Sequence, residues 1–178
     1  KTLAEVAAMR GTPAPETAMD LIVEDGSRVG TVYFSQSEDV VRRAIALPWV
    51  SFCSDEASLA PEGVFLKRNP HPRAYGSHTR FLRTALDGKT VSLPEAVYKM
   101  SGLPAEQFGL KRRGILKEGF AADIIVFDPE AIKEKTTYAE PHRLSEGMQH
   151  VMVNGVHSLE NGKHTARRGG RFLAGNEM

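Results

Sequence analysis

The chain has 178 residues, 41% of them hydrophobic, and a formal net charge of +1. This length and composition exclude a disordered or fibrous protein and predict a globular one with one or two domains. The near-neutral charge argues against nucleic-acid and membrane-surface partners, which select a basic face, and no apolar run reaches the roughly 20 residues of a membrane span.

Helix signals open the chain. Residues 2–9 carry a capping box, Thr2-x-x-Glu5, with apolar residues at helical spacing, and residues 15–26 run from a proline start to a glycine stop. A second box, Ser35-x-x-Glu38, precedes the apolar stripe of residues 40–45. We therefore expect three helices in the first 45 residues.

Two runs rich in β-branched and aromatic residues, 29–36 and 49–55, flank the third helix and predict strands. Further helices are expected around residues 80–86 and at 92–102, where Ser92-x-x-Glu95 begins a helix and Gly102 closes it. Strands separated by helices predict parallel βα units. Two strands cannot close a barrel and the first residue is Lys1, so we expect a fragment of a longer protein.

The pattern changes near residue 113. Residues 121–129 predict a buried strand, and the pairs Asn154-Gly155 and Asn161-Gly162 favour type I′ hairpin turns. The second part therefore predicts a small antiparallel β unit. We expect two domains, residues 1–112 and 113–178.

An acidic residue, Asp55, ends the second predicted strand. Side chains alternate along a strand, so Cys53 and Asp55 share one face while Val50 and Phe52 share the other. In a βα barrel Asp55 would face inward at the carboxyl end of its strand, where catalytic groups lie. A cap for the following loop is an equally good interpretation. The lone Cys53 is expected to be a small buried hydrophobic residue.

A long loop with the motif "HPRAYG" follows Asp55. Loops of this length are often functional. Arg73 in the motif offers a fixed fork of donors for a carboxylate, so it is a candidate anchor for an acidic substrate group. A surface ion pair is the alternative for Arg73.

Several stretches together resemble a known family: "SD" at residues 54–55, "HPRAYG", "AVYKMSGLPAEQFGLKRRGILKEGFAADIIVFDP", "PHRLSEGMQHVMVNG" and "GRFL". They resemble the C-terminal portion of N-acyl-D-amino-acid deacylases, the D-aminoacylase family of the amidohydrolase superfamily. The resemblance implies an α/β fold, with the last two strands and helices of a metal-dependent (β/α)8 TIM barrel in residues 1–112. Residues 113–178 would be the C-terminal share of a small antiparallel β-sandwich.

The resemblance also implies chemistry. Family members are zinc enzymes that hydrolyse small N-acyl-D-amino acids to a D-amino acid and a carboxylate. By family position Asp55 would be the catalytic acid and base, Arg73 would bind the substrate carboxylate, and Gln36 would lie near the substrate pocket. The zinc ligands would lie mostly outside this chain, with Asp55 as the only possible ligand within it, so the chain alone is expected to be inactive.

One departure from the family pattern lies beside the acid. The family commonly has Gly-Ser-Asp-Gly around the acid, where this chain has Cys53, Ser54, Asp55 and Glu56. Two alternatives stay open: an amidohydrolase of cyclic amides, like a hydantoinase or dihydroorotase, and a non-catalytic association module. An incomplete barrel could self-associate through exposed strand edges. We expect a cytoplasmic location.

Overall fold

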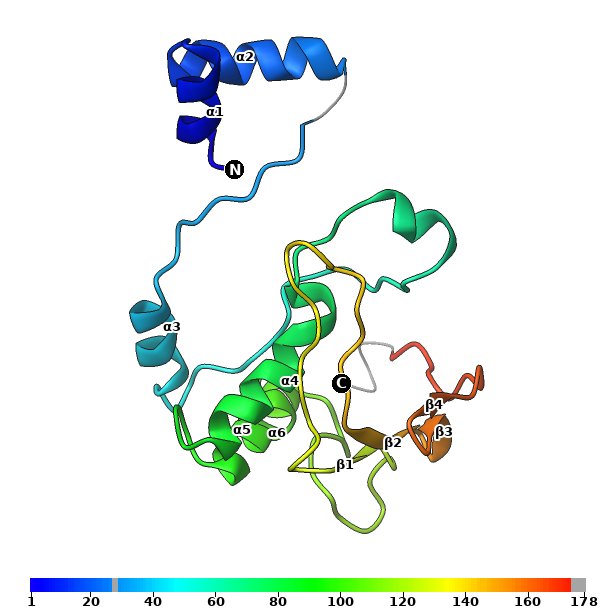
Figure 1. Cartoon of the computed structure of the whole chain (residues 1–178). Helices are drawn as coiled ribbons and strands as arrows, with labels where there is room; N and C mark the ends of the chain where they lie inside the picture. Colours follow the sequence, from blue (N-terminus) through cyan, green and yellow to red (C-terminus); the bar gives the residue numbers. More distant parts are fainter. Residues whose placement is uncertain (27–28, 174–178) are drawn as a thin grey trace. The chain divides into compact units, whose positions relative to one another are not determined.

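A computed structural model describes residues 1–26 and 29–173 (Figure 1). The predicted domains 1–112 and 113–178 therefore include residues 27–28 and 174–178, which lie outside the described residues. The chain forms two compact units, Lys1–Ser35 and Gln36–Met178. In the described part of the chain, no helix has both the length and the apolar character that crossing a membrane requires.

The first unit contains two helices, α1 (Leu3–Arg10) and α2 (Ala14–Asp25), as predicted. The capping box at Thr2 is confirmed: its hydroxyl accepts from the backbone N–H of Glu5 at 3.2 Å, and the Glu5 carboxylate accepts from the Thr2 N–H at 2.6 Å. Gly26 ends α2 with a φ of 64°, which an L side chain rarely adopts. Arg10 joins the two helices through two bonds to the Glu24 carboxylate, at 2.7 and 2.8 Å.

Two predictions for residues 29–45 need correction. Residues 29–36 form no strand, and the next helix, α3 (Glu38–Ile45), is capped by Ser37 rather than Ser35. The Ser37 hydroxyl accepts from the Val40 N–H at 3.3 Å. A strand needs a neighbour for its backbone N–H and C=O groups, and no described strand pairs with this segment.

Residues 49–55 also lack a strand, against the prediction. Their backbone runs along α5 (Leu93–Met100) instead, and the Phe52 N–H donates to the Lys99 carbonyl at 2.9 Å. The Phe52 ring stacks on Phe81 with centroids 4.4 Å apart. Phe52 thus packs against a helix, although the segment is not part of a sheet.

The core of the second unit lies between α4 (Arg73–Leu86) and α5, which continues into α6 (Gly102–Gln107). Helix α4 begins earlier than the expected residues 80–86. Ser92 caps α5 as predicted, accepting from Glu95 N–H at 3.4 Å. Gly102 does not close that helix: Ser101 does, and Gly102 begins α6. A short 3-10 helix, η1 (Gly63–Lys67), lies in the long loop before α4.

Lys99 is a charged residue inside this core. Its side chain is 1% exposed, and its Nζ donates to the carbonyls of Leu47 at 2.5 Å and Val50 at 3.1 Å. A buried ammonium is tolerated only when its donors are satisfied. Lys99 therefore ties the segment after α3 to helix α5.

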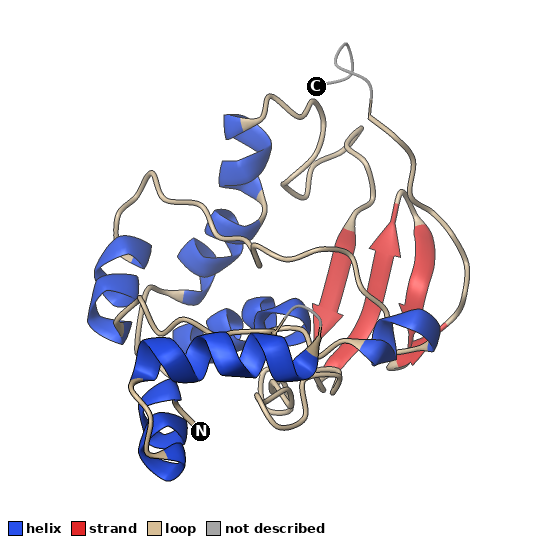
Figure 2. Cartoon of the chain, turned by 90° about the horizontal axis from the view of Figure 1, so that it is seen from above, coloured by secondary structure: helices blue, strands red, loops and turns tan. Residues whose placement is uncertain are grey.

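The C-terminal part forms one antiparallel sheet in the order β1 (Ile124–Phe127), β2 (Met148–Val153), β3 (Val156–Glu160) and β4 (Lys163–His164) (Figure 2). Both Asn-Gly turns are confirmed. Asn154 and Gly155 have φ of 49° and 79°, and Asn161 and Gly162 have φ of 50° and 73°. Positive φ at both central residues is the requirement of a type I′ turn.

The first turn is tied to the segment before the sheet. Arg113 forms an ion pair with Asp123 and donates to the Asn154 side-chain oxygen at 2.7 Å, and Asn154 N–H donates to the Asp123 carboxylate at 2.8 Å. Arg83 of α4 donates to the Pro129 carbonyl at 2.7 Å. The sheet and the helical layer therefore belong to one unit, and the predicted domain boundary after residue 112 stays a prediction.

Candidate active site

Asp55 and Arg73, far apart along the chain, are in contact. The Asp55 carboxylate lies 3.1 Å from Nη1 of Arg73, the first residue of α4. The sequence predicted that Asp55 ends a strand and faces inward, and the structure shows neither. The Asp55 backbone is in the left-handed region with a φ of 51°, and its side chain is 82% exposed. Without strand pairing, the alternation of a strand no longer directs the side chain inward.

A second carboxylate reaches the same guanidinium. Glu56 Oε2 lies 3.5 Å from Arg73 Nε, and Glu56 Oε1 accepts from the Ala57 N–H at 3.1 Å. The Glu56 side chain is only 20% exposed. Arg73 is therefore placed between two carboxylates, one in solvent and one largely buried.

His71 positions the start of α4. Its Nδ1 accepts from the Arg73 backbone N–H at 3.0 Å, and its Nε2 lies 2.9 Å from the Tyr138 hydroxyl. Because Nδ1 accepts, the proton of the neutral ring is on Nε2, which donates to Tyr138. The two rings meet edge to face, with centroids 5.1 Å apart. Burial lowers the pKa of His71, the charge of Arg73 lowers it further, and Glu56 opposes the shift.

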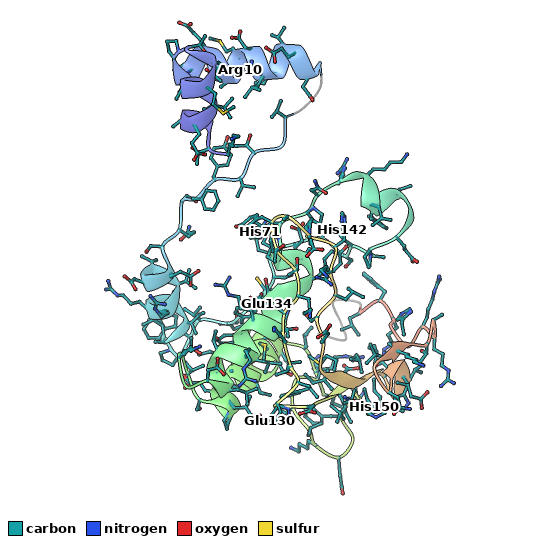
Figure 3. All side chains as sticks on the ribbon, viewed as in Figure 1. Arg10, His71, Glu130, Glu134, His142 and His150 are labelled. Atoms are coloured by element: carbon teal, nitrogen blue, oxygen red, sulfur yellow. The ribbon has the colours of Figure 1, made fainter. Side chains whose placement is uncertain are left out.

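Tyr75 and His142 add two polar groups beside this end of α4. Both the Tyr75 hydroxyl and the Nε2 of His142 are buried, and neither has a hydrogen-bond partner among the described residues. Their rings are 6.5 Å apart, and the Ser145 hydroxyl donates to the Tyr75 carbonyl at 2.9 Å. Figure 3 shows His71 and His142 near the same end of α4. Burial raises the pKa of Tyr75, and the charge of Glu56 adds to the effect.

Sequence reasoning missed three of these residues. It assigned no chemistry to His142 and none to Tyr75 or Tyr138. Tyr75 and His142 do lie in motifs that carried the family resemblance, "HPRAYG" and "PHRLSEG", which is the signal that could have found them. Tyr138 reaches His71 across 67 sequence positions, and no local pattern marks such a contact.

The structure does not bring Gln36 to this group. Gln36 is exposed just before the cap of α3, and no hydrogen bond or ion pair between described residues joins it to Asp55 or Arg73. Cys53 is exposed, against the prediction of a buried position, because the segment that carries it is not covered by a sheet. The place of Gln36 near the substrate pocket thus stays a prediction from family position.

The described residues offer few donors for a metal ion. Within residues 1–26 and 29–173, no group of three or more His, Cys, Asp or Glu side chains could hold a metal ion. A catalytic zinc site has about three protein ligands. Asp55 is the single carboxylate of the candidate site that points into solvent, so the described residues alone do not fit a zinc centre.

A separate cavity of about 420 Å³ lies in the sheet-bearing part of the second unit. Four cationic residues line it together with Asn154: Lys111, Arg112, Arg113 and Arg171. Its lining includes neither Asp55 nor Arg73. The candidate active site lies at the surface at the start of α4, where the side chains of Asp55 and Arg73 are 82% and 42% exposed.

Comparison with known proteins identifies the class. The model of the amidohydrolase family matches residues 1–157. The chain therefore belongs to the amidohydrolase family, as its motifs predict.

Three of the similar proteins, matched over 82% or more of this chain, are a D-aminoacylase and two N-acyl-D-amino-acid deacylases, and a dihydroorotase of Lactobacillus acidophilus is 34% identical over 52% of this chain. The chain is 34% identical to a D-aminoacylase of Alcaligenes xylosoxydans xylosoxydans over 98% of its own length and 34% of that protein's. It is 35% identical to an N-acyl-D-aspartate deacylase of the same organism, over 82% of this chain and 28% of that one. The family resemblance seen in the sequence is confirmed.

A solved structure of a deacylase is also similar to this chain. The N-acyl-D-glutamate deacylase of Bordetella bronchiseptica, determined with zinc and a phosphonate mimic of the tetrahedral intermediate, matches with a TM-score of 0.73 and 34% identity. The match covers 89% of this chain and 31% of that structure. The chain spans about a third of the length of the relatives that it matches.

Proposed function

We propose that this chain is the C-terminal part of a hydrolase that cleaves N-acyl-D-amino acids into a D-amino acid and a carboxylate. Residues 1–112 would complete a (β/α)8 barrel, and residues 113–178 would contribute to a β-sandwich. The extended segments 29–36 and 49–55 would pair as strands once neighbouring strands are present. The similarity to deacylases over nearly the whole chain supports this assignment.

Asp55 would carry the proton. Amide hydrolysis needs a group that takes a proton from the attacking water and delivers it to the departing nitrogen, because an amide anion leaves poorly. A C–O bond to the attacking water forms first, the C–N bond then breaks, and the proton moves from oxygen to nitrogen through the carboxylate. The Asp55 carboxylate contacts Arg73 and its side chain is 82% exposed, so it is accessible to a substrate that binds at Arg73.

Arg73 would hold the free carboxylate of the substrate. A guanidinium binds a carboxylate through two parallel N–H bonds, which fixes the orientation of the ligand as well as its place. Arg73 has this capacity because His71 anchors its backbone and α4 supports it. Gln36 would lie near the same substrate after the strand at residues 29–36 forms.

Zinc would be the cofactor, as in the zinc-bound deacylase structure. When bound, zinc supplies a hydroxide at neutral pH by lowering the pKa of a water molecule. Since the described residues offer only Asp55, the other ligands would come from polypeptide outside them. The described chain by itself would therefore be inactive.

The contact between Asp55 and Arg73 carries the proposal, because it joins the proton carrier and the substrate anchor across a long loop. The test uses the longest natural polypeptide that contains this chain, loaded with zinc. We expect it to release D-amino acids from N-acetyl-D-amino acids, with Arg73→Ala lowering kcat/KM by about 10- to 100-fold. If the protein hydrolyses hydantoins or dihydroorotate and Arg73→Ala does not change that rate, the result would contradict the proposal and favour a cyclic amidase. Failure to hydrolyse either class would favour the association module.

A further inference from the structure

Glu56 stands in the candidate site where the family pattern has a glycine, and its carboxylate is fixed at both oxygens. One oxygen lies 3.5 Å from Arg73 Nε, and the other accepts from the Ala57 backbone N–H at 3.1 Å. The side chain is 20% exposed, whereas that of Asp55 is 82% exposed. Glu56 is therefore a held negative charge, while Asp55 can move into solvent.

This placement has a consequence for binding a carboxylate at Arg73. The cluster has one guanidinium and two carboxylates, so its formal charge is negative before any substrate arrives. A substrate carboxylate can displace the exposed Asp55 from Nη1, but Glu56 stays beside Nε because the Ala57 N–H also binds it and its side chain is only 20% exposed. A like charge brought next to a held carboxylate is repelled.

We propose that Glu56 is a specificity-determining residue that selects against substrates with an acidic side chain. This rests on the proposed function. An N-acyl-D-amino acid with a neutral side chain brings one carboxylate, which Arg73 neutralises. An N-acyl-D-aspartate or N-acyl-D-glutamate brings a second carboxylate, which the net negative charge of the Asp55, Glu56 and Arg73 cluster repels. The chain would thus prefer neutral or basic D-amino acids, although its relatives include N-acyl-D-aspartate and N-acyl-D-glutamate deacylases.

Two substrates and two variants test this. N-Acetyl-D-alanine and N-acetyl-D-aspartate are compared in the zinc-loaded longest natural polypeptide, its Glu56→Gln variant and a control, Glu62→Gln. Glutamine keeps the size of Glu56 and removes its charge. Glu62 is an exposed carboxylate in the same loop. It controls for a general change in surface charge.

We expect the unchanged protein to prefer N-acetyl-D-alanine, and Glu56→Gln to raise kcat/KM for N-acetyl-D-aspartate about three- to tenfold more than for N-acetyl-D-alanine. Glu62→Gln should leave the ratio unchanged. A preference of the unchanged protein for N-acetyl-D-aspartate would overturn the inference. An identical ratio in Glu56→Gln would overturn it as well.

A binding measurement separates this inference from the proposed function. Isothermal titration calorimetry in the presence of a chelator gives the Kd of both ligands without hydrolysis. If no variant hydrolyses either substrate but Glu56→Gln still tightens N-acetyl-D-aspartate binding selectively, the deacylase assignment fails and the role of Glu56 stands. If hydrolysis occurs and the two Kd values change in parallel, the role of Glu56 fails alone.

Discussion

The Nδ1 atom of His71 accepts the backbone N–H of Arg73 at 3.0 Å, while the opposite nitrogen of the ring contacts Tyr138 at 2.9 Å. One imidazole thus joins the start of α4 to the segment that carries Tyr138. Each ring nitrogen makes a different contact, so different substitutions can remove the contacts one at a time.

Substitutions at His71 should have unequal effects. The side-chain oxygen of His71→Asn can replace Nδ1, whereas the longer His71→Gln imitates Nε2 and leaves the Arg73 N–H without its acceptor. We expect His71→Gln to lower the free energy of unfolding by about 1 kcal/mol and His71→Asn by less than half of that. Urea unfolding measures both, with Tyr138→Phe as the control for the Nε2 contact. Equal losses in the two variants would show that the Nδ1 bond is not the important one.

Acid should weaken the same contact. Because the pKa of His71 is lowered from 6.5, the folded state binds fewer protons than the unfolded state just below that pH. The stabilisation is therefore present above pH 6.5 and is lost as the pH falls through the lowered pKa. Unfolding free energies at pH 7.5 and 5.0 should differ more in the unchanged chain than in His71→Asn. The same pH dependence in both would refute the role of His71.

The buried Lys99 should stabilise the fold through its two carbonyl partners. Lys99→Met keeps the length of the side chain but removes both Nζ bonds, so the Val50 carbonyl loses this donor, while the Leu47 carbonyl still accepts from the Val50 N–H. We expect a loss of about 2 kcal/mol in the free energy of unfolding. Lys89→Met is the matched control, since Lys89 is exposed and pairs only with Asp87, and it should change stability by less than about 0.5 kcal/mol. A Lys99→Met variant as stable as its control would contradict this prediction.

The two Asn-Gly turns allow a matched comparison. Asn154 and Asn161 have nearly the same φ, 49° and 50°, but among the described residues the Asn154 side chain accepts from Arg113 and donates to the Gly169 carbonyl. Asn154→Ala should therefore cost about 2 kcal/mol more than Asn161→Ala, because its side chain has partners that the other lacks. Thermal or urea unfolding of both variants measures the two losses of free energy of unfolding. Equal losses would contradict the prediction and mean that the turn conformation alone matters.

Local features could be predicted from the sequence because each depends on a few neighbouring residues. The capping box at Thr2, the cap at Ser92 and the Asn-Gly turns follow from side chains that bond their own backbone or accept positive φ. The start of the third helix was predicted two residues too early, because Ser35 and Ser37 are both suitable caps. Ser37 is the one followed directly by an acidic first turn, Glu38 and Asp39.

Non-local features could not be predicted in the same way. Residues 29–36 and 49–55 have strand composition, yet a strand forms only with a partner, and the described strands pair with one another instead. The exposure of Asp55 follows from that missing pairing. The group around Arg73 and its neighbour His71 includes residues from two other segments, Glu56 and Tyr138, which the fold brings together.

The rate of amide hydrolysis after removal of the Asp55 carboxylate tests the central claim most directly. In the zinc-loaded longest natural polypeptide, Asp55→Asn should lower kcat for N-acetyl-D-alanine by about 10²- to 10⁴-fold, because the proton then has no carrier. The neighbouring Ser54→Ala should keep its rate, and unfolding curves should show both variants folded. An Asp55→Asn variant that releases D-alanine as fast as Ser54→Ala would contradict the account.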